Sequence, residues 1–351
     1  MSKAGRVPRV AALAVIIPVR DAERQLAICL RALQQSSVLP AEVLVVDDGS
    51  SDGSASVAAK LGARVLRFAA SRGPAAARNA GAKAVRQPVI MFLDADVMVH
   101  RDTIELTDDA LTRDSGVGAL FGAYDDAPLE PGLVSQYRNL LHHFTHCTAA
   151  RNAWTFWAGC GAIRRDLFFG CGGFDERYQE PSVEDIELGL RLSQAGVRII
   201  VAPEIQVCHM KKWTFPGMLR TDILRRAWPW SRLLLAAGSL PADLNLGWSQ
   251  RASAIFAWLS LGLAAFGFIR GTAFLGALAA AGVVAILNRP LFGFLTRVRG
   301  FAFAVRAFPL HFLYLLYSSA TFLMAAIVHP LQSVRTPRRL TADTSGPEAG
   351  I

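Results

Sequence analysis

Cysteine is scarce in this chain, and the few cysteines it has form no recognisable pattern. No two are spaced as C-x-x-C, and none have the spacing of zinc ligands; the five are Cys29, Cys147, Cys160, Cys171 and Cys208. This argues against both a zinc site and a disulfide framework. An odd number of unpatterned cysteines indicates reduced thiols in a cytoplasmic domain.

Acidic residues are scarce beyond residue 210. That part of the chain has 15 Lys and Arg but only 4 Asp and Glu, a balance of +11, whereas residues 1–210 have a balance of −2. A nucleic-acid-binding protein would carry its positive surface on the folded domain, so this distribution argues against that class. Basic residues beside apolar stretches are instead typical of segments that flank a membrane.

Charge is nearly absent between residues 252 and 328, whereas residues 1–240 have the composition of an ordinary mixed domain. Three apolar stretches lie in this region, at residues 252–269, 272–287 and 307–328. The first and third approach the roughly 20 residues that cross a bilayer. Arg297 and Arg299 interrupt the apolar stretch 291–305, which favours an interfacial or re-entrant helix. We predict three to four membrane segments within 251–330 and a disordered polar tail at 331–351; the alternative is a helical bundle buried in a soluble domain.

The first hundred residues alternate between short apolar runs and helical patterns. Apolar runs occupy residues 10–19, 43–46, 64–68 and 89–93, and helical stretches lie between them. The N-terminal run resembles a signal peptide, but Pro18 and the charges after it end the run without a small-residue cleavage site. The alternation predicts an α/β domain at 1–240 with a mainly parallel sheet, closed by a basic connector. Ligands of such sheets bind at the carboxyl ends of the strands.

Acidic clusters follow two of the predicted strands. Asp94 and Asp96 stand one residue apart after the run 89–93, where they suit a divalent cation that also binds a diphosphate; a solvated turn is the alternative. Asp47 and Asp48 follow the run 43–46 and would accept hydrogen bonds from a base or ribose. Their alternative is a turn and helix cap.

Four further residues are candidates for chemistry, and each also has a structural interpretation. Arg78 would pair with a phosphate or merely with an acid. Asp185, after Glu184, would act as a general base; alternatively Ser182 and Asp185 form a capping box. His209 would be a third metal ligand or a structural histidine. An acceptor pocket is predicted from an aromatic residue and a glycine-rich turn: Trp157, Gly159, Cys160 and Gly161.

The ordered set of motifs resembles the family 2 glycosyltransferases of the GT-A fold. In order they are VIIPV at 15–19, VVDDGSSD at 45–52, ARNAG at 77–81, FLDAD at 92–96, GGFDE at 172–176 and VEDIEL at 183–188. The resemblance covers roughly residues 12–230.

The resemblance implies a role for each of these residues. Asp94 and Asp96 would hold Mg²⁺ or Mn²⁺ together with the diphosphate. Glu184 and Asp185 would form the family's catalytic ED pair, with Asp185 as the base of an inverting displacement. Donor-binding residues would be Pro18, Val19, Asp47, Asp48, Arg78, Asp94, Arg225 and Arg226.

One motif departs from the family's processive members. Polysaccharide synthases carry Q-x-x-R-W, whereas residues 224–228 read LRRAW. The missing Gln favours transfer of one sugar over polymer synthesis. A nucleotidyltransferase is disfavoured because no G-x-G-T-R sequence follows the first strand. A degenerate, non-catalytic membrane protein is disfavoured by the intact acids.

The membrane region suggests a lipid-linked or otherwise hydrophobic acceptor. Positive charges gather after its second stretch, at Arg289, Arg297, Arg299 and Arg306, against Arg270 alone in the preceding loop. The positive-inside rule therefore places the catalytic domain in the cytoplasm of a multi-pass membrane protein. Three crossings would leave the C-terminal tail outside, and a fourth would return it.

Overall fold

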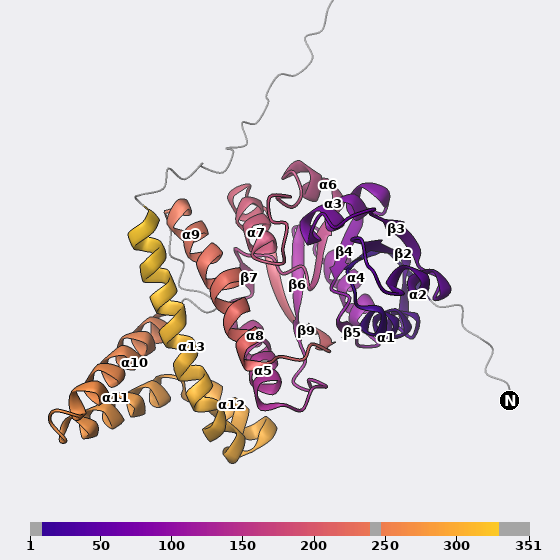
Figure 1. Cartoon of the computed structure of the whole chain (residues 1–351). Helices are drawn as coiled ribbons and strands as arrows, with labels where there is room; N and C mark the ends of the chain where they lie inside the picture. Colours follow the sequence, from indigo (N-terminus) through magenta and orange to yellow (C-terminus); the bar gives the residue numbers. More distant parts are fainter. Residues whose placement is uncertain (1–8, 239–246, 330–351) are drawn as a thin grey trace, which may run out of the picture.

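The computed structural model describes residues 9–238 and 247–329 (Figure 1). An α/β unit with a nine-stranded sheet comes first along the chain, and a group of helices follows it. The predicted tail at 331–351 lies outside the described residues. Within them the α/β fold is confirmed.

The first half of the sheet is parallel and is built from the predicted runs. Its strands are β1 (Arg9–Val19), β2 (Val38–Asp47), β3 (Arg64–Arg67) and β4 (Val89–Leu93), in the order β3-β2-β1-β4. The connecting helices are α1 (Glu23–Gln34), α2 (Ser54–Lys60) and α3 (Pro74–Ala84). Leu26, Leu30 and Leu33 are buried on one face of α1, as their spacing predicts.

The second half of the sheet is mixed. Its strands are β5 (Val97–Val99), β6 (Ala119–Tyr124), β7 (Asn152–Ala153), β8 (Cys160–Arg164) and β9 (Ile199–His209). Strand β8 runs antiparallel between β4 and β6, whereas β6 and β9 are parallel. The helices of this half are α4 (Thr103–Arg113), α5 (Leu133–Thr148), α6 (Arg165–Gly170) and α7 (Glu184–Gln194). Strands β1, β2, β4, β6 and β9 therefore end at the same edge.

Apolar cores cover both faces of the sheet. One core contains Leu26 of α1 and Ile104 of α4, and the other contains Ala77 of α3 and Leu188 of α7. The strands are consequently buried on both sides, which explains their continuous apolar sequence.

The predicted basic connector is a helix that changes its hydrogen-bonding pattern twice. Helix α8 (Phe215–Arg220) passes into a π-helix, η1 (Thr221–Ala227), and then into α9 (Trp228–Ala237). π-helical turns are rare and occur frequently at functional sites. Arg225 and Arg226 lie in this turn.

The C-terminal helices correspond to the predicted apolar stretches. They are α10 (Trp248–Gly267), α11 (Ala273–Leu287), α12 (Arg289–Arg299) and α13 (Phe301–Val328). In Figure 1, α10 and α11 form a hairpin on the side away from the sheet, and α13 lies between this hairpin and α9. Helices α12 and α13 share an apolar core with α5 that includes Tyr137, Leu140 and Leu295.

One helix of the described residues, α13, is long and apolar enough to cross a membrane. Only 28% of its most apolar window is buried. Helices α11 and α12 meet the same criterion only as a pair, bent by 73°. One or two of the three to four predicted crossings therefore have the required length and composition in the described part of the chain, and α10 is not among them. Exposed apolar side chains are nevertheless common on α10 and α11, including Ile255, Leu275 and Leu278.

Candidate active site

A cavity of about 260 Å³ opens at the edge where the parallel strands end. Asp94 and Asp96 reach it after β4, Tyr124 at the end of β6, and His209 at the end of β9. Asp185, in the first turn of α7, completes its acidic lining. The position agrees with the rule that open α/β sheets bind ligands beyond the carboxyl ends of their strands.

Arg78 lies between two carboxylates at the base of this cavity. Its Nη2 donates to Asp94 Oδ1 at 2.8 Å and its Nη1 donates to Glu184 Oε1 at 2.8 Å. Burial alone would lower the pKa of Arg78, but the two carboxylates outweigh it and the net shift is upward. Arg78 therefore pairs with the buried Glu184 and the partly exposed Asp94, and links the end of β4 to α7.

Asp185 is held by backbone N–H groups, with its carboxylate against the loop before β8. Ala158 N donates to Oδ2 at 3.1 Å and Ile186 N donates to Oδ1 at 2.8 Å. Burial and the neighbouring Glu184 raise the pKa of Asp185 to about 7. A carboxyl group with this pKa is suited to proton transfer near neutral pH.

The capping box that was the alternative interpretation of Ser182 and Asp185 is not formed. Val183 is the N-cap of α7, and no side chain caps it. Ser182 Oγ instead donates to the carbonyl of Arg225 at 3.0 Å, and Ser182 N donates to Glu184 Oε2 at 2.8 Å. Glu184 thus accepts from a residue that precedes the helix, whereas Asp185 accepts from Ile186 N in the first turn and also lines the cavity.

Gly189 allows α7 to approach the loop that carries the aromatic lining. A Cβ atom at Gly189 would lie 2.1 Å from Phe156 N, so no larger residue fits without displacing the backbone. This contact fixes the position of α7, and with it Asp185, relative to Phe156 and Trp157 in the cavity wall.

His209 faces Asp96 across the cavity. The two side chains approach to 3.4 Å between Nε2 and Oδ2. The opposite ring nitrogen, Nδ1, lies 2.6 Å from Asn139 Oδ1, to which it donates. Tyr124 stacks on the imidazole with ring centroids 4.2 Å apart. A histidine that binds a metal is usually oriented in this way: one ring nitrogen donates to a protein oxygen, and the other is free to face the metal. No group of three or more His, Cys, Asp or Glu side chains with metal-site geometry occurs among residues 9–238 and 247–329.

Asp47 and Asp48 accept hydrogen bonds from backbone and side-chain groups at their own edge of the sheet. Ser50 N donates to Asp47 Oδ1 at 2.9 Å, and Arg67 lies 3.1 Å from Oδ2. Ser71 Oγ and Arg72 N each donate to Asp48 at 2.7 Å. The turn predicted as the alternative for these acids is therefore present. Neither lines the cavity, and the donor contact predicted for them stays a prediction.

The remaining predicted site residues divide into two groups. Trp157, Arg225 and Arg226 line the cavity. Pro18, Val19, Gly159, Cys160 and Gly161 do not. A Cβ on Gly159 would meet the ring of Trp157 at 2.5 Å, and one on Gly161 would meet the Trp157 carbonyl at 2.3 Å. These glycines therefore allow a close approach to Trp157, and the acceptor contact predicted for them stays a prediction. Cys160 is buried in β8, and burial raises the pKa of its thiol to about 12.

One face of α5 supplies cavity residues that the sequence analysis did not identify. Arg138, His142 and His146 recur every four residues and all line the cavity. His146 donates from Nδ1 to the carbonyl of Gly122 at 3.0 Å, and burial lowers its pKa to about 4. The four-residue spacing of polar side chains was a signal that was available in the sequence.

Comparison of the sequence and comparison of the fold with known proteins both find glycosyltransferases. Residues 14–169 match the model of the family described as Glycosyl transferase family 2. The chain is 31% identical over 239 residues to pre-mycofactocin glycosyltransferase of Mycobacterium tuberculosis, a match that covers 61% of this chain and 45% of that protein. It is 29% identical over 221 residues to N-acetylglucosaminyl-diphospho-decaprenol L-rhamnosyltransferase of the same species, covering 52% of this chain and 70% of that protein.

Solved structures extend the similarity of fold beyond the sheet. A mannosyltransferase from Pyrobaculum calidifontis, in complex with GDP-Man and Mn²⁺, is 19% identical and has a TM-score of 0.56, covering 93% of this chain and 90% of that chain. Residues 1–349 of S. aureus TarS, in complex with UDP-GlcNAc, are 16% identical with a TM-score of 0.50, covering 89% and 88%.

Proposed function

Because residues 14–169 form a family 2 glycosyltransferase domain with the GT-A fold, we propose that the protein transfers one sugar from a nucleotide-diphosphate sugar to an acceptor hydroxyl. The observation that carries this proposal is the meeting of acids from two distant parts of the sequence in one cavity. Asp94 and Asp96 after β4 line the same space as Asp185 of α7. Their roles are those that the motifs imply.

The proposed reaction is a single displacement with inversion. Asp185 accepts the proton of the acceptor hydroxyl, and the hydroxyl oxygen forms a bond to the anomeric carbon as the bond from that carbon to the diphosphate breaks. The backbone donors from Ala158 and Ile186 keep the carboxylate oriented. Glu184 stabilises the start of α7 and pairs with Arg78, so it acts as a positioning residue.

We propose that a divalent cation binds in the cavity together with the diphosphate. Asp94, Asp96 and His209 are the residues that would hold Mg²⁺ or Mn²⁺, and the Nε2 atom of His209 already faces Asp96. When bound, the cation would neutralise the diphosphate and so stabilise it as a leaving group. Arg225 and Arg226 line the same cavity and are candidates for the diphosphate.

A lipid-linked acceptor is the proposed second substrate. Helix α13 is long and apolar enough for a membrane, and it contacts η1 and α9, which line the cavity. The name of the rhamnosyltransferase relative describes a decaprenol-linked acceptor of that protein. We propose a catalytic unit at 1–240 and a membrane region at 251–330, with hexosyltransferase activity.

The catalytic unit is proposed to face the cytoplasm. Arg299 at the end of α12 donates to Gln136 Oε1 at 2.7 Å and to the carbonyl of Asp126. The basic stretch that the positive-inside rule places in the cytoplasm therefore touches the α/β unit directly, on the same side of any membrane.

The test of the proposed chemistry is Asp185→Asn. The variant keeps the shape of the side chain and one acceptor oxygen but cannot take up the acceptor proton. We expect sugar transfer to fall by a factor of about 10² to 10⁴, with donor affinity unchanged. Transfer at the wild-type rate would rule out Asp185 as the base. Glu130→Gln, a change in the loop before α5 and outside the cavity, is the matched control.

Donor identity and metal dependence need a separate experiment. Purified protein is heated with UDP-, GDP- and dTDP-sugars, with and without Mn²⁺, and stabilisation by one donor identifies the nucleotide. We expect the Mn²⁺-dependent part of that stabilisation to disappear in Asp96→Ala. An unchanged Mn²⁺ titration would exclude Asp96 from the metal site. Stabilisation of wild type by a donor without any transfer to lipid or soluble acceptors would support the alternative, a non-catalytic binding protein. Release of products with several added sugars would support a processive synthase.

A further inference from the structure

A second cavity lies against the catalytic one, and we propose that it holds the hydrocarbon chain of the acceptor, with the phosphate of that lipid at the junction of the two cavities. The inference rests on the proposed function, because it assigns a place to the acceptor of that reaction. It commits to a single isoprenyl-like chain that carries a phosphate.

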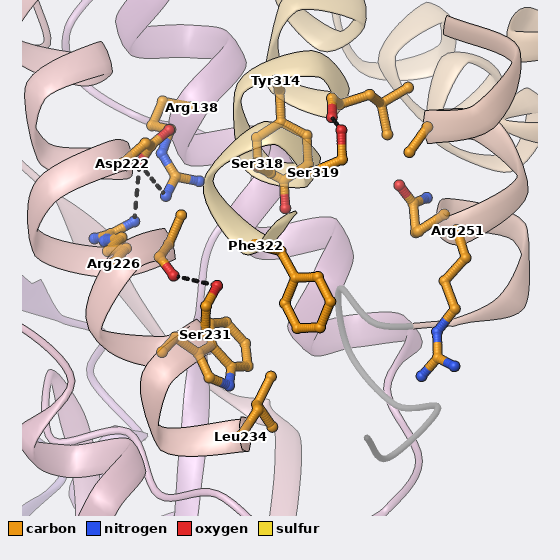
Figure 2. Close-up of a pocket in the computed structure, with 15 residues that line it drawn as sticks. Arg138, Asp222, Arg226, Ser231, Leu234, Arg251, Tyr314, Ser318, Ser319 and Phe322 are labelled. Carbon is orange, nitrogen blue, oxygen red and sulfur yellow. Dashed lines mark hydrogen bonds and ion pairs between the residues drawn. The ribbon is translucent and has the colours of Figure 1, made fainter. Parts of the chain in front are cut away.

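The second cavity is enclosed by helices from both parts of the molecule (Figure 2). Its volume is about 280 Å³. Helix α9 contributes Leu234, α10 contributes Ala254, and α13 contributes Leu315 and Phe322. Polar side chains such as Gln250 and Ser318 also line the cavity, but most of its surface is apolar. Such a cavity between helices is suited to an apolar ligand, since polar groups would lose their hydrogen bonds to water there.

The two cavities share part of their lining. Arg138 of α5, Arg226 of η1 and Trp230 of α9 line both of them. A molecule that extends past these side chains would therefore have one end beside α13 and the other in the space that Asp185 faces. The π-helical turn places Arg226 at this junction, which gives a structural reason for the irregularity of the helix.

Charge at the junction favours an anionic group. Arg138 Nη2 donates to Asp222 Oδ1 at 2.9 Å, and Tyr317 of α13 donates its hydroxyl to Asp222 Oδ2 at 2.6 Å. Arg226 lies farther from the same carboxylate, at 3.8 Å. Two guanidinium groups thus share one buried carboxylate. Burial and the nearby Arg138 lower the pKa of Arg226, which is the response of a cation that lacks sufficient negative charge around it. A phosphate would supply that charge and accept hydrogen bonds from the guanidinium.

The position of α13 favours a lipid as the occupant. This helix lines the apolar cavity and is also the described helix with the length and composition of a membrane span. A lipid chain could therefore pass from the bilayer into the cavity along α13. The assignment gives Arg226 to the acceptor phosphate and leaves Arg225, which pairs with Glu180 at 2.7 Å, for the donor.

The experiment measures binding of labelled geranylgeranyl phosphate to the full-length protein in nanodiscs. Dimethylallyl phosphate, which has the same head group and a much shorter chain, is the competitor of low affinity. Two variants fill the cavity from different walls, Ser318→Trp and Ala254→Trp. Leu323→Trp, on the exposed side of α13, adds the same indole outside the cavity and is the control.

We expect wild type and Leu323→Trp to bind geranylgeranyl phosphate at least about tenfold more tightly than dimethylallyl phosphate, or about 1.4 kcal/mol. Both cavity variants should lose this preference while keeping the melting temperature of wild type. Equal binding by wild type and the cavity variants would overturn the proposal. Displacement of the probe by phosphatidylglycerol at equal concentration would also overturn it, because the cavity would then hold an ordinary bilayer lipid.

Failure of the proposed function has a different signature. Donor-dependent stabilisation, measured on the same preparations with UDP-, GDP- and dTDP-sugars and Mn²⁺, does not depend on the apolar cavity. Chain-length-dependent binding without any donor response would overturn the transferase proposal and support the lipid site. A donor response with no chain-length preference would overturn the lipid site alone.

Discussion

The carboxyl edge of the sheet and the C-terminal helices both bury polar side chains, but they do so with different chemistry. At the sheet edge, Arg78 makes two ion pairs of 2.8 Å with Asp94 and Glu184. Among the helices, Asn288 links its neighbours by hydrogen bonds alone. Its Oδ1 accepts from Gln250 at 2.9 Å and from His311 Nε2 at 3.0 Å, and its Nδ2 donates to Ser253 Oγ at 2.8 Å.

The difference follows from what each region has to do. Buried charges are costly unless they are paired, and replacing such a pair with apolar groups is often neutral or stabilising. Charges kept at the sheet edge therefore point to a chemical role, which is to hold acids beside a cavity. Helices that face lipid gain nothing from charge, and neutral hydrogen bonds can fix their mutual angle without it. Asn288 lies at the junction of α11 and α12, where the axis bends by 73°.

The largest expected effect comes from removing the cation at the sheet edge. Arg78→Met removes the cation that pairs with the buried Glu184 and with Asp94, whose side chain is 33% exposed, and breaking a buried pair costs about 3–5 kcal/mol. The free energy of unfolding can be measured by urea denaturation followed by tryptophan fluorescence. Arg72→Met is the matched control, because Arg72 is exposed and makes a longer ion pair, of 3.4 Å, with Glu176. A loss of about 1 kcal/mol or less in unfolding free energy is expected there. Equal losses of unfolding free energy in the two variants would show that the ion pairs of Arg78 contribute no more to stability than the exposed pair of Arg72 does.

A smaller loss of stability is expected at Asp48, whose carboxylate accepts hydrogen bonds from a loop instead of pairing with a cation. In Asp48→Asn, an amide replaces the Oδ2 atom that accepts from Ser71 Oγ and, at 3.0 Å, from Gly73 N. We expect a loss of about 1–3 kcal/mol in unfolding free energy, since buried donors lose their acceptor. Asp109→Asn is the control, because the Asp109 carboxylate pairs with Arg9 and Arg113, whose side chains are exposed. Unchanged stability together with a large loss of donor affinity would show that Asp48 serves the nucleotide and not the loop.

The pH dependence of transfer tests the environment of Asp185. Because burial and Glu184 raise the pKa of Asp185 to about 7, the base is protonated in acid. The rate should rise about tenfold per pH unit between about pH 5 and pH 7 and then level off. In Asp185→Asn the residual rate should be flat over the same interval. A flat wild-type profile below about pH 7 would contradict the role of this carboxyl group as the base.

The same pKa shift also predicts a trend in stability. A carboxyl group whose folded pKa lies above its ordinary value binds more protons in the folded state than in the unfolded state. Its contribution therefore declines as pH rises from about 4 to about 7. Asp185→Asn should lack this decline, so its melting temperature relative to wild type should increase across that interval. The opposite sign would mean that the carboxylate is stabilised, not desolvated, in the folded protein.

The parallel half of the sheet could be predicted from sequence because its signals are local. Each apolar run is followed directly by turn residues, as in Asp47 to Gly53, and the runs are long enough to recognise. The other half depends on pairing between distant segments, such as Leu93 with Cys160, and on strands as short as Asn152–Ala153. Nothing in the sequence near these strands states their partners, so the antiparallel insertion of β8 was not predicted.

The candidate site shows the same division. Asp94, Asp96 and His209 follow strand ends, so their meeting follows from topology once the strands are recognised. Arg138, His142 and His146 lie on a helix in a stretch that had no clear period of apolar residues, and they were missed. The capping box did not form because Val183, not Ser182, is the N-cap of α7, and the Ser182 hydroxyl donates to the carbonyl of Arg225. A short capping pattern is compatible with several hydrogen-bonding arrangements, and tertiary packing determines which one forms.

The smallest expected effect is at the neutral network of the helices. Asn288→Leu has a similar size but leaves Gln250, Ser253 and His311 without their shared partner, and hydrogen bonds between helices in a membrane contribute about 0.6–2 kcal/mol. Thr296→Val is the matched control, because the Thr296 hydroxyl donates only to Phe292 within its own helix. Unfolding in nanodiscs should therefore become easier by about 1 kcal/mol in Asn288→Leu and remain nearly unchanged in the control. A loss as large as that of Arg78→Met would show that the helices depend on buried polarity as strongly as the sheet edge does, because the bend between α11 and α12 would then be held by Asn288 and not by apolar packing.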